Sequence, residues 1–143
     1  MSATQALVAA IVARYNSSAG DAIRTAGSTG IYFGRAPQSA SYPFIVLSIP
    51  ASEAQPTAGQ GTDAAGQYAD IEVQVSCFTD QRSPSVPFSV IGAWHAAFNF
   101  QTLSLASPYR QVWGRKIDDG IPIEEPSEKG WQVAAVYGYN IAE

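Results

Sequence analysis

Two stretches of the chain place apolar residues three and four positions apart, which is the spacing of an amphipathic helix. The first covers residues 3–15, with Ser2 and Thr4 as candidate N-caps because a hydroxyl there can accept a backbone N–H. The second opens at Ser83-Pro84-Ser85-Val86-Pro87 and reaches about Phe100, since proline is tolerated in a first helical turn. Its apolar stripe comprises Val90, Ile91, Trp94, Ala97 and Phe98.

Other stretches are too short for helices or alternate with a period of two, which predicts β-strands. Residues 69–78 alternate cleanly, and residues 131–141 place Trp131, Val133, Ala135, Tyr137, Tyr139 and Ile141 on one face. Residues 44–49 are apolar on both faces, which predicts a strand that is covered on each side. Three further strands are predicted at residues 31–33, 102–105 and 109–115.

Three segments carry turn residues and no apolar period, so they are predicted to be loops. They are residues 20–30, 51–68 and 118–130. Strands 44–49 and 69–78 should pair as a long β-hairpin whose flexible tip is residues 51–68.

This order of elements predicts an α+β fold. We expect one domain over residues 1–143: an antiparallel β-sheet with two α-helices packed on one face and a long flexible β-hairpin. Such a sheet has free edges, and an unpaired edge strand invites pairing with another chain.

Composition narrows the class of protein. Apolar residues make up 46% of the 143 residues and charged residues only 14%, which favours a surface partly covered by partners. The formal net charge is −4 and no basic run occurs, so we expect no dedicated nucleic-acid binding. No signal peptide and no apolar stretch long enough for a bilayer are expected.

Candidate catalytic residues are few. Cys77 is the single cysteine and His95 the single histidine. A thiol on the apolar face of a strand is hard to ionise, and a lone histidine on a packed helix is usually structural. We therefore expect no catalytic residues and no enzyme activity.

Metal and cofactor sites are not expected either. Asp118-Asp119 and Glu124-Glu125 are adjacent pairs that do not converge readily in a strand, and a metal needs three or four ligands. The glycine-rich stretches 27–30 and 59–61 lack the Gly-Lys-Ser/Thr of a phosphate-binding loop.

A series of short motifs carries a family resemblance. In order along the chain these are Ile31-Tyr32-Phe33-Gly34, Ala36-Pro37-Gln38, Tyr42-Pro43-Phe44-Ile45-Val46, Val73-Gln74-Val75-Ser76-Cys77-Phe78 and a helix with Ala93-Trp94. This series resembles the tail-terminator, or tail-completion (minor tail), proteins of long-tailed bacteriophages.

The resemblance implies a structural role in the virion. Such proteins form a hexameric ring on the head-proximal end of the tail tube, stop tube polymerisation and present a surface to the head-completion (neck) protein. The implied partners are therefore copies of the chain itself, the tail tube protein and the neck protein, with assembly in the host cytoplasm. DNA would pass through the lumen without specific binding, and no membrane is involved.

Interface residues are predicted from the loops that lie beyond the expected sheet. They are Glu53, Gln55, Asp63, Gln67 and Arg82. Three alternatives stay open: another neck component such as an adaptor or stopper, a small hydrolase using Cys77 or Glu124/Glu125, and a cellular ligand-binding α+β module.

Overall fold

The computed structural model describes residues 2–55, 68–125 and 130–143. Its elements are α1 (Ala3–Asn16), the 3-10 helix η1 (Ser18–Gly20), α2 (Asp21–Thr25), β1 (Ile31–Phe33), β2 (Phe44–Gln55), β3 (Tyr68–Thr79), α3 (Ser85–Phe98), β4 (Arg110–Glu125) and β5 (Gly130–Ala142).

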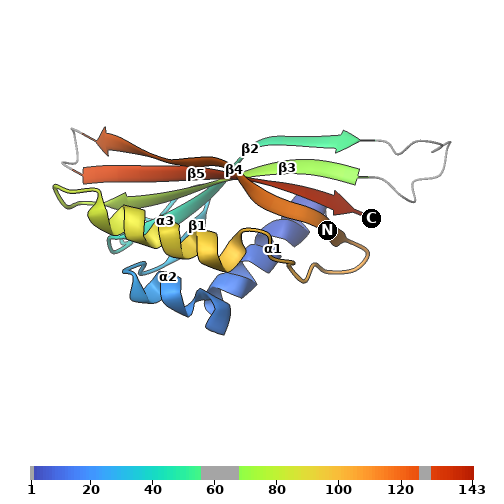
Figure 1. Ribbon diagram of the computed structural model, residues 1–143, viewed down its shortest axis with the longest axis horizontal. Helices are drawn as coiled ribbons and strands as arrows, with labels where there is room; N and C mark the ends of the chain where they lie inside the picture. The colour runs from blue at the N-terminus through green and yellow to red at the C-terminus, as the bar shows by residue number, and fades with distance from the viewer. Residues whose placement is uncertain (1, 56–67, 126–129) are drawn as a thin grey trace.

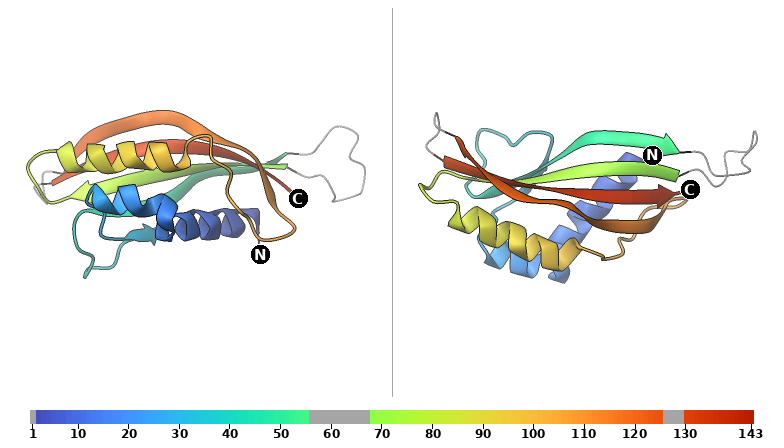
Figure 2. Two further views of the ribbon diagram at one scale, coloured as in Figure 1. Left: turned by 60° about the horizontal axis from the view of Figure 1, so that its bottom comes forward. Right: turned by 45° about the horizontal axis from the view of Figure 1, so that its top comes forward.

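The strands form one sheet in the order β1-β2-β3-β5-β4. Neighbouring strands are antiparallel except β1 and β2, which are parallel. All three α-helices lie on the same face of the sheet (Figures 1 and 2). The predicted α+β class is confirmed, with a parallel first strand and the short helix α2 as the differences.

Helix α1 begins with a complete capping box. Ser2 Oγ accepts the N–H of Gln5 at 3.2 Å, and Gln5 Oε1 accepts the N–H of Ser2 at 2.8 Å. The two bonds satisfy donors that a helix start leaves free. Of the candidate caps, Ser2 is therefore the one used, and the helix predicted over residues 3–15 is confirmed.

Helix α3 confirms the second predicted stripe. Pro84 is its N-cap residue and Pro87 lies in its first turn, where the missing N–H is not needed. Its buried residues include all five of the predicted positions.

Residues 20–30 were expected to be a loop, and this prediction is wrong for the five residues of α2. Ile23 is fully buried and anchors the segment. Arg24 bonds to the Tyr15 carbonyl and forms an ion pair with Asp21. Tertiary contacts thus stabilise a helix that is too short to show an apolar periodicity in the sequence.

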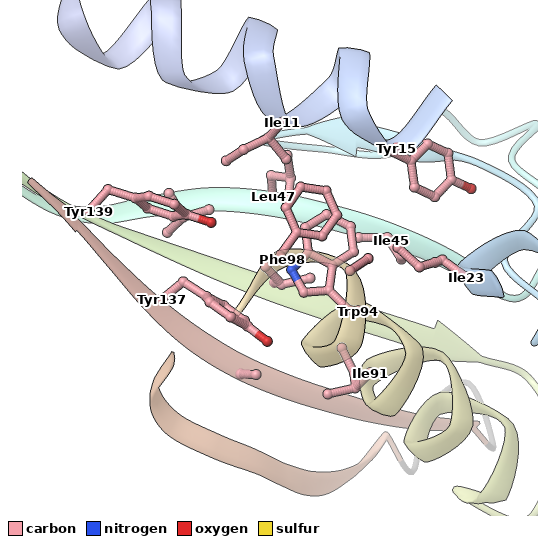
Figure 3. Packing of buried hydrophobic residues seen from close by; sticks show 14 of the residues in the cluster. Ile11, Tyr15, Ile23, Ile45, Leu47, Ile91, Trp94, Phe98, Tyr137 and Tyr139 are labelled. Carbon is pink, nitrogen blue, oxygen red and sulfur yellow. The ribbon is translucent and has the colours of Figure 1, made fainter. Parts of the chain in front are cut away.

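The core lies between the helices and the sheet. Trp94 and Phe98 of α3 stack at 4.1 Å between ring centroids and face Tyr137 and Tyr139 of β5. Ile11 of α1 approaches from the other side (Figure 3).

Two predicted loops are partly strand. β2 extends to Gln55 and pairs with β3 from Tyr68 onward, so residues 51–55 and 68 belong to the hairpin; residues 56–67 lie outside the described ranges. β4 likewise continues through residues 118–125. The strand predicted at residues 102–105 is absent, since this segment has no regular structure.

Candidate interaction surfaces

The candidate thiol nucleophile is buried and neutral. Cys77 has no exposed surface, and burial raises the pKa of its thiol to about 12. A thiol with such a pKa is protonated at neutral pH and is a poor nucleophile.

The histidine has a structural partner. His95 lies on α3, and its Nδ1 forms a hydrogen bond with the hydroxyl of Tyr137 in β5. The bond links α3 to the sheet, so the single histidine has a structural role that needs no catalytic explanation.

Metal-ligating side chains do not gather in the described part of the chain. Within residues 2–55, 68–125 and 130–143, no three His, Cys, Asp or Glu side chains lie where they could hold an ion. Asp118 and Glu124 are exposed along β4. None of the helices in these ranges combines the length and apolar character needed to cross a membrane.

The described members of the predicted interface set, Glu53, Gln55 and Arg82, lie at opposite ends of the sheet. Glu53 and Gln55 lie in β2 opposite Asp70 and Tyr68 of β3, at the hairpin end of the sheet. Arg82 lies beyond the other end of β3, is exposed, and accepts a bond from Trp131 Nε1 through its carbonyl at 2.9 Å. Asp63 and Gln67 fall outside the described residues.

The middle of the sheet face opposite the helices carries polar side chains, and several of them hydrogen-bond to one another. Ser76 Oγ accepts from Gln74 Nε2 and from Gln132 Nε2, both at 3.1 Å. Asn140 Nδ2 donates to Asp70 Oδ1 at 2.6 Å. No described helix covers this face (Figure 2), so it is a broad surface on which neighbouring side chains already bond to one another.

A hollow lies where this open face meets the loop of residues 34–43. Its volume is about 440 Å³, and its apolar floor is made by Phe44 and Val46 of β2 and Phe78 of β3. Tyr42 packs against Phe44 at 4.9 Å between ring centroids, and Phe44 against Phe78 at 5.5 Å. Arg35 is an exposed cation in the lining. We call this hollow the aromatic pocket.

The opposite edge of the sheet, β4, is closed to a further strand along its first half. The segment after α3 runs beside it: Phe100 N–H donates to the Gly114 carbonyl at 3.2 Å, and Lys116 N–H donates to Asn99 Oδ1 at 2.8 Å. These bonds use backbone groups that an added strand would need.

The pairing of β4 is irregular along the strand. The register against β5 shifts at three places, between Gln111 and Trp113, between Lys116 and Asp118, and between Asp118 and Ile121. Pro122, which lacks an N–H, follows. The expectation that a free edge invites strand pairing therefore does not hold for β4, because bulges, proline and charge are devices that oppose it.

Exposed apolar side chains collect along this guarded edge. They are Phe100, Val112, Trp113 and Ile117, which we call the β4 ridge. Trp113 is 40% exposed and carries the Arg115 guanidinium over its ring at 5.2 Å from the centroid. Phe100 is 77% exposed. The signals for this ridge in the sequence are weak, because the apolar spacing places Phe100 at the end of a helix and Trp113 in an ordinary strand.

No protein-family model matches the chain, and no curated protein sequence matches it. A chain in the solved structure titled "Virion of native gene transfer agent (GTA) particle" superimposes with a TM-score of 0.75 at 15% sequence identity, covering 98% of this chain and 97% of the other. The protein therefore shares, over nearly its whole length, the fold of a chain found in a gene transfer agent virion.

Proposed function

We propose that this protein is a non-enzymatic structural component of a virion, and that it caps the head-proximal end of a tail tube as a ring. The ring ends tube polymerisation and offers the surface that joins tail to head. Its partners are copies of itself, the tail tube protein and a neck protein.

The observation that carries the proposal is the match to a chain of a gene transfer agent virion across both full lengths. The match covers 98% of this chain and 97% of the other chain. Two independent features agree with it. The series of motifs from Ile31 to Trp94 resembles tail-terminator proteins, and the candidate thiol Cys77 is buried and protonated.

The test is deletion of the gene for this protein from the genome that encodes the particle. We expect tails of uncontrolled length that fail to join heads, because nothing ends the stacking of tube subunits. Complementation with the intact chain should restore uniform tails. Tails of normal length that join heads normally in the deletion strain would overturn the proposal.

A second candidate role is another neck component, such as an adaptor or stopper, because the fold match identifies a virion and not a position within it. The two roles are distinguished by mixing the purified protein either with tails that lack this protein or with tailless heads. Binding to tails supports the terminator role, and binding to heads alone supports the neck role.

A further inference from the structure

We propose that successive copies of this chain join head to tail, with the β4 ridge of one copy seated in the aromatic pocket of the next. This inference rests on the proposed ring and names the surfaces that would close it. The contact is made by side chains and does not extend the sheet.

We take Phe100 as the main contact residue of the ridge, because both its backbone conformation and its exposure are unfavourable in an isolated subunit. Its backbone has φ of 58°, a left-handed conformation that bulky residues rarely adopt and that glycine or asparagine adopts at less cost. The side chain is also 77% exposed. Strain and apolar exposure at one residue are typical of a binding position.

The conformation of Phe100 is fixed from both sides. Its own N–H is bonded to Gly114, and the next N–H, of Gln101, bonds to the Phe98 carbonyl at 3.2 Å. Gln111 of β4 holds the segment further on, donating to the Gln101 carbonyl at 2.8 Å and accepting the Leu103 N–H at 3.1 Å. The aromatic ring is thus presented on a rigid base, which lowers the entropy lost on binding.

The aromatic pocket has the complementary chemistry. It offers an apolar floor and tyrosine and proline walls, with a volume of about 440 Å³ that admits large side chains. Arg35 in its lining forms no ion pair with the described residues. The ridge carries both signs of charge, the Arg115 guanidinium over Trp113 and the exposed Asp118 carboxylate after Ile117. The favoured docked orientation therefore brings Asp118 and not Arg115 to Arg35.

The placement of the two surfaces determines the kind of assembly. The ridge lies at the β4 edge and the pocket lies at the β1–β2 edge, which are opposite ends of the strand order. A contact between different surfaces on opposite edges repeats from copy to copy, and a repeated rotation closes it into a ring. The occupant of the pocket is therefore a second copy of the chain.

Cysteine crosslinking of the full chain tests the contact, because native Cys77 is buried. Ala40 lines the pocket and Val112 is an exposed member of the ridge, so Ala40→Cys and Val112→Cys place one thiol on each surface and keep the Phe100 ring. Under mild oxidation we expect a disulfide-linked dimer when the two variants are mixed and little when either is alone. A chain carrying both substitutions should give a ladder of covalent oligomers. Absence of the mixed dimer, or equal dimerisation of Val112→Cys alone, would overturn the proposal.

A matched pair of substitutions adds an affinity measurement. Phe100→Ala removes the ring at the contact, while Phe88→Ala removes an equally apolar, exposed ring from α3, outside both surfaces. Sedimentation should show copy–copy association weakened about tenfold to a hundredfold by the first and unchanged by the second. Equal effects, or a wild-type chain that stays monomeric and uncrosslinked at high concentration, would contradict the contact. Tails of normal length that join heads normally in the deletion strain, in contrast, would contradict the proposed function itself.

Discussion

At the scale of single residues, burial and hydrogen bonding explain the groups that first suggested chemistry. Cys77 and Tyr139 are fully or almost fully buried, and burial raises the pKa of each; for Tyr139 the charge of Arg14 opposes part of the rise. Both groups are therefore held in their neutral forms. Their effect should be visible in stability at alkaline pH.

Cys77→Ala should reduce the dependence of stability on alkaline pH. In the unfolded chain the thiol ionises near pH 8.5, while in the folded chain its pKa is about 12. Between these values the unfolded chain has lost a proton that the folded chain keeps, so stability falls by about 1.4 kcal/mol per pH unit. Urea unfolding from pH 8 to pH 10 should show this fall in the wild type and a shallower one in the variant. Parallel curves would contradict the assignment.

At the scale of elements, hydrophobic spacing predicted what faces the core. α1, α3 and the alternation of β3 and β5 follow from it, because burial selects the apolar side of each. It failed where backbone pairing decides. Residues 51–55 of β2 and 118–125 of β4 carry mostly small, polar or turn-forming side chains, yet the neighbouring strands supply hydrogen bonds that hold them in the sheet.

The same limit explains the candidate surfaces. The sequence predicts Glu53, Gln55 and Arg82 on or beside loops, whereas the structure has the first two in β2, paired with β3. The aromatic pocket joins residues 34–46 to Phe78, and the β4 ridge joins Phe100 to residues 112–117. Neither grouping could be predicted without knowing which strands are neighbours.

Two glycines of the β4–β5 pair give a matched test of strand packing. A Cβ at Gly114 would lie 2.6 Å from the ring of Tyr139, which is in the core, whereas a Cβ at Gly138 would lie 2.5 Å from the mobile end of the exposed Ile117. Gly114→Ala should therefore destabilise by about 1–3 kcal/mol, as overpacking does. Gly138→Ala should change stability by less than about 1 kcal/mol, because Ile117 can turn aside. Equal shifts in the urea midpoint would contradict this picture of the two faces.

At the scale of the whole molecule, the subunit is a slab with helices on one side and a bare, polar sheet on the other (Figure 2). Asp70 and Glu72 lie on the bare face, and the Arg115 guanidinium there lies over Trp113. The formal net charge of the chain is −4. A surface of this kind offers little to phosphate groups.

The wild-type chain should therefore not bind double-stranded DNA at physiological salt in a mobility-shift assay. Glu72→Lys combined with Gln74→Lys reverses the charge on the bare face without touching the Asn140–Asp70 bond. That variant should retain DNA weakly and release it as salt is raised, because phosphate contacts displace counterions. Salt-sensitive binding by the wild type would contradict the expectation that DNA passes without being held.

The hydrogen bonds along the β4 edge have a consequence for free subunits at high concentration. An exposed strand at high concentration is a template for fibres of unlimited length. Here Asn99 and Phe100 bond to β4 from within the same chain, so part of that template is already occupied. In the assembly proposed above, growth therefore ends when the circle closes instead of continuing as a fibre.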